Sequence, residues 1–185
     1  MGSAPRSWAL AAAIGALWCW MSPGLHATTV LALDGDTLIQ KAELIVQAAC
    51  THLESYRDPD GRIVTRYSFR VLKTLKGSEQ STLTFVQPGG EVQGVATVIP
   101  GLSHFSVGDE VVLFLGPEER YRLPVGLNQG VFRVQADPKD GQLRVQRSVT
   151  GLHLLPSSGK PLPSNMLLEE FLELVRAGVA RTSNK

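Results

Sequence analysis

Two long segments of alternating apolar and polar residues, joined by a turn signal, constrain the fold of this chain more than any other feature. In the segment 43–55 the apolar face consists of Leu44, Val46, Ala48 and Cys50. In the segment 62–75 the matching face consists of Ile63, Thr65, Tyr67, Phe69 and Val71. Residues that share a face at period 2 are typical of β-strands. The intervening Asp58-Pro59-Asp60-Gly61 favours a tight turn, so we predict a long antiparallel hairpin.

Shorter segments with the same strand pattern follow the hairpin. The predicted strands are 81–87, 91–99, 110–115, 121–125, 131–135 and 142–147. The segment 110–115 is apolar on both faces, which indicates a central strand that is covered on both sides. Many short strands separated by turns favour a small barrel or sandwich. We therefore expect a mainly β fold, a small antiparallel barrel of about seven or eight strands over residues 42–147.

Helical periodicity occurs at the C-terminal end, after a predicted linker over residues 148–163. The apolar residues at helical spacing are Leu168, Phe171, Leu172, Val175 and Val179. We predict one amphipathic helix over residues 164–180, capped by Ser164 or Asn165. Its polar face is acidic in the early turns, so docking on the barrel is favoured over binding to anionic lipid. Near the N-terminus, Thr37 is expected to cap a single helical turn that ends at Ala42.

The first 27 residues are typical of a secretory signal peptide. Arg6 precedes an apolar run of 14 residues from Trp8 to Met21. A membrane-spanning helix needs about 18 residues or more, so this run is too short to be one. A helix-breaking segment and the small residue Ala27 follow. We expect cleavage after Ala27, a secreted or periplasmic location, and a single domain over residues 28–185. An uncleaved anchor and lipid attachment at Cys19 are the alternatives.

Cleavage would change the composition of the domain. All three Trp residues and Cys19 lie in the predicted signal peptide, so Cys50 would be left as a lone thiol without an intramolecular disulfide partner. Arg6 is the only charged residue removed, which reduces 18 Lys and Arg to 17 against 17 Asp and Glu. A neutral domain without a basic patch gives no electrostatic reason to expect a nucleic-acid partner. We also expect no stable membrane span after cleavage. The composition does not indicate whether the chain is a monomer or an oligomer.

Residues that could carry catalysis are sparse in the predicted domain. Its histidines are His52, His104 and His153, without the local spacing that zinc ligands usually show. Cys50 could be a nucleophile, but its place on an apolar strand face favours a buried, inert thiol. Neither Ser103 nor Ser106 lies in a Gly-x-Ser-x-Gly elbow. Acidic turns that could bind calcium are better explained by turn formation. We expect no cofactor and no metal, and we consider an enzyme less favoured than a binding protein.

Two glycine-rich loops are the candidate binding elements. They are the segments 87–91 and 126–130, which place amide side chains among glycines and so allow a partner to approach the backbone closely. The candidate binding residues are Gln87, Pro88, Gly89, Gly90, Asn128, Gln129 and Arg133. The alternative is that both loops are ordinary connections between strands.

The order of these features resembles a known group of proteins. The matching segments are Ala42 to Val46, residues 67–77 ending in Leu75-Lys76-Gly77, and residues 107–115 with Gly108-Asp109-Glu110 before an apolar strand. Together they resemble a family of uncharacterised secreted bacterial proteins and, more distantly, the netrin-like module of tissue inhibitors of metalloproteinases. The resemblance covers about residues 42–136 and implies an OB-type barrel. The inhibitors bind zinc through a disulfide-held N-terminal cysteine, whereas this chain would begin at Thr28, so their inhibitory residues have no counterpart here.

Three functional hypotheses follow from the sequence. The leading one is an exported, non-catalytic binding module that recognises another envelope or secreted protein, with proteases among the candidate partners. The second is a small secreted hydrolase whose His and acidic residues come together only in the fold. The third is a structural component of the cell envelope.

Overall fold

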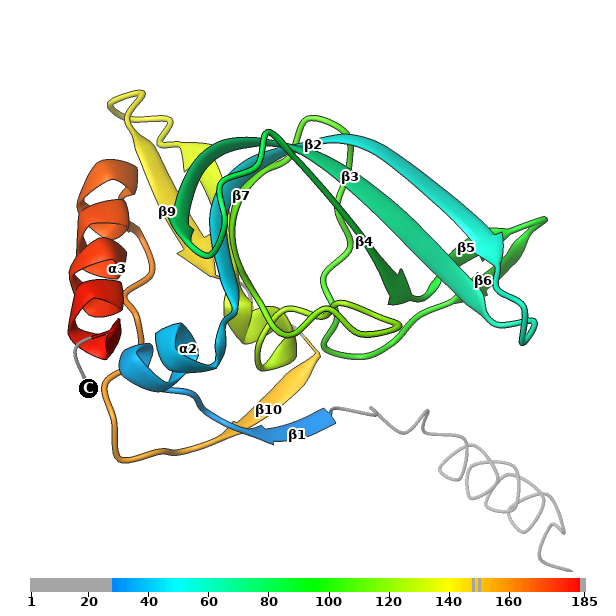
Figure 1. The fold of residues 1–185 in the computed structure, drawn as a ribbon, viewed down its shortest axis with the longest axis horizontal. Coiled ribbons are helices and arrows are strands. Elements are labelled where there is room, and N and C mark those ends of the chain that lie inside the picture. Colours follow the sequence, from blue (N-terminus) through cyan, green and yellow to red (C-terminus); the bar gives the residue numbers. More distant parts are fainter. Residues whose placement is uncertain (1–27, 148, 150, 184–185) are drawn as a thin grey trace, which may run out of the picture.

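A long, bent hairpin organises the sheet. In the computed structural model, which describes residues 28–147, 149 and 151–183, strands β2 (Leu44–Arg57) and β3 (Ile63–Lys76) pair antiparallel. This confirms the predicted hairpin. The pairing shifts register at three places, between Ile45 and Val46, Gln47 and Ala48, and Cys50 and His52. Such bulges bend and twist a strand pair, and Figure 1 shows the hairpin curving along its length. The predicted signal peptide lies outside the described residues.

The hairpin belongs to a seven-stranded antiparallel sheet in the order β11-β9-β8-β7-β2-β3-β4 (Figure 1). The remaining strands are β4 (Thr82–Pro88), β7 (Glu110–Leu115), β8 (Val131–Ala136), β9 (Leu143–Arg147) and β11 (Met166–Leu167). The predicted mainly β fold with a C-terminal helix is confirmed at this level. Hydrogen-bonded pairing between named strands ends at β4 on one side and at β11 on the other.

Two predicted strands differ in the structure. The segment 91–99 is not one strand but a small hairpin of β5 (Gly90–Val92) and β6 (Val95–Thr97). Its chain reverses at Gln93 and Gly94, both of which have positive φ. The segment 121–125 is not a strand either, because its only ladder contact is an isolated bridge between Leu115 and Pro124. In both segments the apolar residues next to turns follow the pattern expected of a strand. No neighbouring strand pairs with the whole of either segment.

A separate two-stranded ribbon lies outside the main sheet. Strand β10 (Leu152–Leu155) falls within the predicted linker and pairs in parallel with β1 (Thr28–Leu31). The ribbon is largely exposed, and its paired residues Leu31 and Leu155 are 58% and 46% exposed. A two-stranded pair of this kind is marginal alone, so contacts with the neighbouring loops must hold it in place.

The two described helices begin at other residues than predicted. Helix α2 (Gly35–Lys41) is capped by Asp34, whose Oδ1 accepts a hydrogen bond from the Thr37 amide at 2.8 Å, so the predicted cap at Thr37 is wrong. Helix α3 (Leu168–Ser183) begins only after β11, so Ser164 and Asn165 do not cap it. Neither helix combines the length and apolar character needed to span a membrane, within the described ranges.

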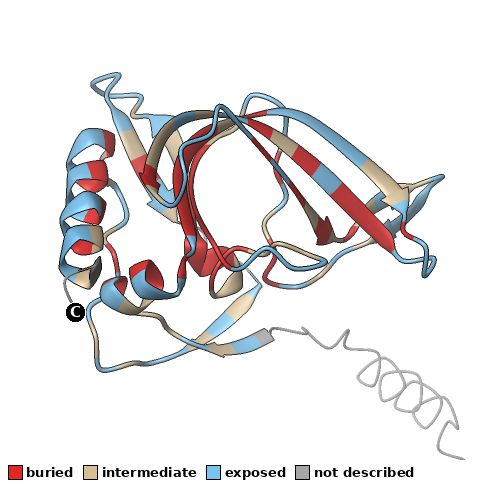
Figure 2. Ribbon diagram, viewed as in Figure 1, coloured by how far each residue is buried: buried red, intermediate tan, exposed pale blue. Residues whose placement is uncertain are grey.

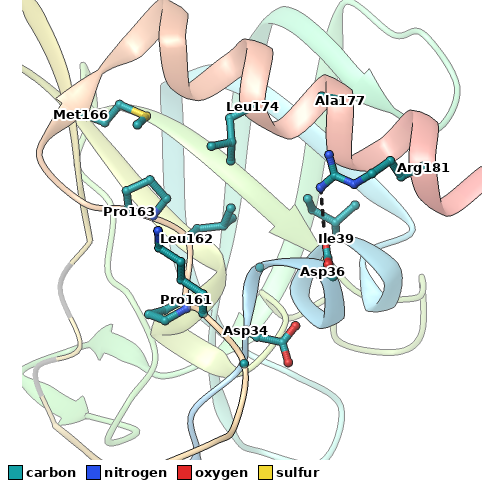
Figure 3. A pocket seen from close by; sticks show the side chains of 13 residues that line it. Asp34, Asp36, Ile39, Pro161, Leu162, Pro163, Met166, Leu174, Ala177 and Arg181 are labelled. Carbon is teal, nitrogen blue, oxygen red and sulfur yellow. Dashed lines mark hydrogen bonds and ion pairs between the residues drawn. The ribbon is translucent and has the colours of Figure 1, made fainter.

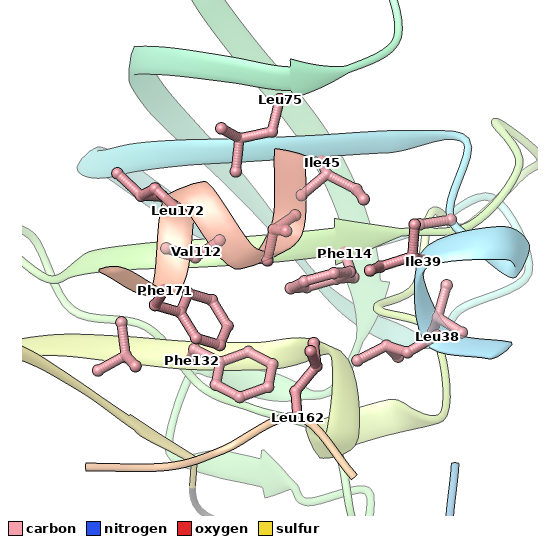
Figure 4. Close-up of a cluster of buried hydrophobic side chains, with 14 of the residues drawn as sticks. Leu38, Ile39, Ile45, Leu75, Val112, Phe114, Phe132, Leu162, Phe171 and Leu172 are labelled. Carbon is pink, nitrogen blue, oxygen red and sulfur yellow. The ribbon is translucent and has the colours of Figure 1, made fainter. Parts of the chain in front are cut away.

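One face of the sheet packs against α2 and α3. Its core contains Phe114 of β7, Phe132 of β8 and Phe171 of α3, all fully buried (Figure 4). The Phe132 ring lies between the other two, with centroid separations of 5.6 Å to Phe114 and 4.7 Å to Phe171. In Figure 2 the buried residues of α3 face the sheet, which confirms that the apolar side of this helix docks within its own domain.

The other face curls around a second core. Tyr67, Phe69, Phe85 and Phe105 form an aromatic cluster there, with ring centroids 5.1–6.4 Å apart. Strand β7 contributes to both cores, Val112 and Phe114 to the first, and Val111 and Leu113 to the second. The prediction that this strand is covered on both faces is therefore confirmed.

Asp58 ties the tip of the β2–β3 hairpin to the segment 118–122. Its carboxylate accepts hydrogen bonds from the Tyr121 hydroxyl at 2.6 Å and from the guanidinium of Arg120 at 3.1 Å. The amides of Asp60 and Arg62 also donate to it. The Tyr121 hydrogen bond is the main cause that lowers the pKa of Asp58 from 3.8 to about 2, although its desolvation opposes the shift. The predicted turn thus also acts as a tertiary contact.

We expect this contact to make the fold acid-sensitive. A carboxyl group whose pKa is lower in the folded state stabilises the fold above its unfolded pKa, and this contribution is lost as the pH falls from 3.8 to about 2. Asp58→Asn should therefore unfold at a lower temperature than the wild type near neutral pH, and the difference should shrink towards pH 2. Thermal unfolding followed by circular dichroism at several pH values measures this. A constant difference across that range would contradict it.

Candidate functional site

The two predicted binding loops meet on either side of Ser103. The Gln87 side chain at the end of β4 donates through Nε2 to the Ser103 carbonyl oxygen at 2.6 Å. The Ser103 hydroxyl donates to Oδ1 of Asn128, which lies in the 3-10 helix η1 (Leu127–Gly130). The backbone N–H of Asn128 in turn donates to the Gly101 carbonyl oxygen at 2.9 Å. Two of the predicted residues thus hold one intervening segment, 98–104, that the sequence analysis did not single out.

Gln87 is a supporting residue rather than an exposed one. Its side chain is 1% exposed, and its Oε1 is buried without a hydrogen-bond partner among the described residues. A buried amide oxygen without a partner is costly. The structure therefore places this residue behind the surface, where it fixes Ser103.

The neighbouring residues Pro88, Gly89 and Gly90 serve the backbone. Thr65 Oγ1 donates to the Gly89 carbonyl at 2.7 Å, and Gly90 has a φ of 129°. A Cβ on Gly90 would lie 2.3 Å from Thr65 Oγ1 and 2.5 Å from Ser55 Oγ. Glycine is thus required here for close packing on the hairpin, and Pro88 ends the edge strand opposite Val64.

Gln129 holds the N-terminal ribbon. Its Oε1 accepts from the Leu33 amide at 2.7 Å, and its Nε2 donates to the Leu31 carbonyl at 3.1 Å. The side chain is 1% exposed. With both ends of the amide engaged, Gln129 anchors β1 and offers a partner no free polar group.

Arg133 on β8 braces the same segment that Gln87 and Asn128 hold. Its guanidinium pairs with Asp109 at 2.5 Å and donates to the His104 carbonyl. The guanidinium carbon also lies 5.7 Å from the centre of the buried Phe105 ring. The side chains of Arg133 and Asp109 are both 30% exposed, so this brace reaches the surface.

A shallow hollow of about 390 Å³ lies beside this hydrogen-bonded segment. We call it the 98–104 hollow; its lining residues are Val98, Ile99, Pro100, Gly101, Leu102, Ser103, His104, Asn128, Arg133 and Gly151. Of the predicted site residues, Asn128 and Arg133 line it. Val98 is 70% exposed, the highest value among the large apolar side chains that the structure describes as exposed. The sequence signal that could have indicated this hollow is the run Val98-Ile99-Pro100-Gly101. In it an apolar pair directly precedes a Pro-Gly turn dipeptide.

A larger cavity of about 690 Å³ lies between the two helices (Figure 3). We call it the α2–α3 cavity; its lining residues are Asp34, Gly35, Asp36, Ile39, Gly159, Lys160, Pro161, Leu162, Pro163, Met166, Leu174, Ala177 and Arg181. This volume is in the usual range of small-molecule sites. No sequence pattern indicated the cavity, because the segment 34–39 of one wall lies far along the chain from the segments 159–166 and 174–181 that complete it.

The side chains that the hydrolase hypothesis would use are the histidines, the acidic residues and Cys50. The ion pairs between described residues all join Arg or Lys to Asp or Glu, and none involves a histidine. The described part of the chain also holds no group of three or more potential metal ligands. Cys50 is 2% exposed, and burial, with a smaller contribution from the Asp109 charge, raises the pKa of its thiol. A thiol in such a setting is poorly nucleophilic.

Comparisons with known proteins identify no family for this chain. No protein-family model, curated protein or solved structure matches it.

Proposed function

We propose that this chain is an exported, non-catalytic binding module that recognises another secreted or envelope protein through the 98–104 hollow. The observation that carries the proposal is the double hold on Ser103 by Gln87 and Asn128. Functional loops are commonly displayed on a rigid scaffold. A loop fixed in this way presents its exposed residues without the entropic cost of ordering them on binding.

The exposed chemistry of the hollow suits a protein partner. Val98 supplies apolar surface, while His104 and Arg133 supply polar groups at the rim. An apolar centre with a polar rim is the usual arrangement of protein interfaces, and Arg is enriched in them. A secreted protease is the partner class that the netrin-like resemblance implies, although this chain would use a loop surface in place of an N-terminal cysteine.

We also propose that the curled sheet is an OB-like barrel whose open side is closed by the segment 116–124. Two contacts support this. The Arg122 amide donates to the Val86 carbonyl of the edge strand β4 at 3.2 Å, and Pro124 forms a bridge with Leu115 of β7. OB-type barrels bind their partners through one face and its connecting loops. The segment 98–104 lies between β4 and β7 along the chain. It would then be a binding loop of this barrel, with the 98–104 hollow beside it.

Site-specific photo-crosslinking tests the proposed function. A photoreactive amino acid at position 98 or, as a control, at position 143 is introduced in the exporting cell; both are exposed apolar positions, Val98 at 70% and Leu143 at 46%. We expect position 98 to form one discrete adduct with another exported protein and position 143 to form none. Equal adducts from both positions, or none from position 98, would contradict the proposal.

A further inference from the structure

The α2–α3 cavity lies apart from the proposed binding surface and shares no lining residue with it. One wall is helix α3, and the facing wall consists of α2 and the segment 159–163 (Figure 3). The facing wall is tightly built. The Gly35 amide donates to the Lys160 carbonyl at 3.0 Å, and a Cβ on Gly159 would collide with Asp34 at 2.3 Å. Pro161 and Pro163 further restrict the backbone of this wall.

Helix α3 lines the cavity with a second apolar stripe. Its core-facing stripe is the set that packs on the sheet, which includes Phe171 and Val175. Leu174 and Ala177 lie outside that set, three residues apart, and face the cavity with Arg181 one turn further on (Figure 3). Leu174 is 37% exposed.

The two helices meet closely at one end of the cavity, which keeps the walls in place. A Cβ on Gly178 of α3 would lie 2.4 Å from the Ile39 Cδ1 of α2. Ile39 also lines the cavity, together with Leu162 and Met166. The apolar part of the lining therefore consists of aliphatic and thioether side chains beside the prolines, and these suit an alkyl chain.

The charges at the rim select the ligand's head group. Asp34 is engaged by Thr37, which donates to its carboxylate through both its amide and its hydroxyl, at 2.8 and 2.9 Å. Asp36 is paired with Arg181 at 3.2 Å. The Lys160 ammonium group has no hydrogen-bond or ion-pair partner among the described residues, and its side chain is exposed. Asp34 keeps its negative charge, but its oxygens already accept hydrogen bonds. Lys160 is therefore the charged lining residue whose side chain has no direct partner among the described residues.

We propose that the α2–α3 cavity binds a monocarboxylate amphiphile, with the alkyl chain against Leu174, Ile39 and Met166 and the carboxylate at Lys160. A single-chain fatty acid has this chemistry. The site is separate from the 98–104 hollow and shares none of its lining residues. Loss of either site by mutation should therefore leave the other intact.

Calorimetric titration of the purified protein with dodecanoate, below its micellar concentration, tests this inference. We expect saturable binding at one site. Leu174→Asp should weaken it by more than about tenfold, because a charge would replace apolar contact area. Leu53→Asp is the matched control, since Leu53 and Leu174 are both 37% exposed, and should leave the affinity unchanged. Ala177→Phe should also weaken binding, because the larger side chain would fill the cavity. This variant introduces no charge, so it separates loss of the cavity from a folding defect caused by a new aspartate.

The head group is tested separately. Lys160→Gln should weaken dodecanoate binding by about threefold or more while leaving dodecanol binding unchanged. Absence of dodecanoate binding to the wild type, or unchanged binding by both cavity variants, would overturn the site. Dodecylammonium binding as tight as that of dodecanoate, or equal dodecanoate binding by Lys160→Gln, would overturn the assignment of the carboxylate.

Discussion

Phe132→Ala should lower the free energy of unfolding by about 3–5 kcal/mol, the usual cost of removing a large aromatic side chain from a core. Phe132 is fully buried between Phe114 of the sheet and Phe171 of α3. Its removal would leave a cavity at the junction of these two elements, where neither can move inward without losing other contacts. Since domains of this size are stable by only about 5–15 kcal/mol, the variant should lose a large part of its stability.

Denaturant unfolding followed by far-ultraviolet circular dichroism measures this loss. Phe132→Leu is the control, because leucine keeps apolar contact with both rings and should cost clearly less. A loss below about 1 kcal/mol for Phe132→Ala would contradict the account, since it would mean that the ring does not join α3 to the sheet.

Val98→Asp should weaken binding of the proposed partner by at least about thirtyfold, the effect expected at one of the few central residues that dominate an interface. Val98 is the most exposed apolar side chain of the 98–104 hollow, at 70%. An aspartate there would have to lose its hydration against an apolar partner surface, which is costly without a compensating charge. The substitution should hardly affect folding, because the side chain makes few contacts with the rest of the molecule.

The hairpin and the central strand could be predicted from the sequence because their signals are local. In β2 and β3 the period-2 pattern extends over many residues, and Asp58 and its neighbours mark the turn. Strand β7 is apolar at every position after Glu110, which only a doubly covered strand explains. The spacing of Phe171, Leu172 and Val175 likewise predicted the docking face of α3.

The ribbon and the helix starts could not be predicted in the same way. The parallel pairing of β1 with β10 joins residues far apart along the chain, and it depends on the Gln129 side chain, which no periodic pattern reveals. At α2, both Asp34 and Thr37 are good N-cap residues, and the Gly35 contact with Lys160 fixes the earlier start. Tertiary contacts decided between options that were locally equivalent.

The sequence indicated two glycine-rich loops as candidate binding elements, and binding by these loops stays a prediction. Their glycines and amides indicated close backbone approach, and this is what Gly90 and Gln129 provide, but to the protein's own chain. Only Asn128 and Arg133 of the predicted residues reach the 98–104 hollow. Ser103, which Gln87 and Asn128 hold, was not predicted as a binding residue because a serine in an irregular loop has no distinctive pattern.

The measurement that tests the proposed binding surface most directly is the dissociation constant of the protein captured from position 98, determined for wild type, Val98→Asp and Leu143→Asp side by side. We predict that Val98→Asp weakens binding by at least about thirtyfold and that Leu143→Asp matches the wild type. Equal affinity of all three proteins would contradict the account, because the partner would then be bound elsewhere on the molecule.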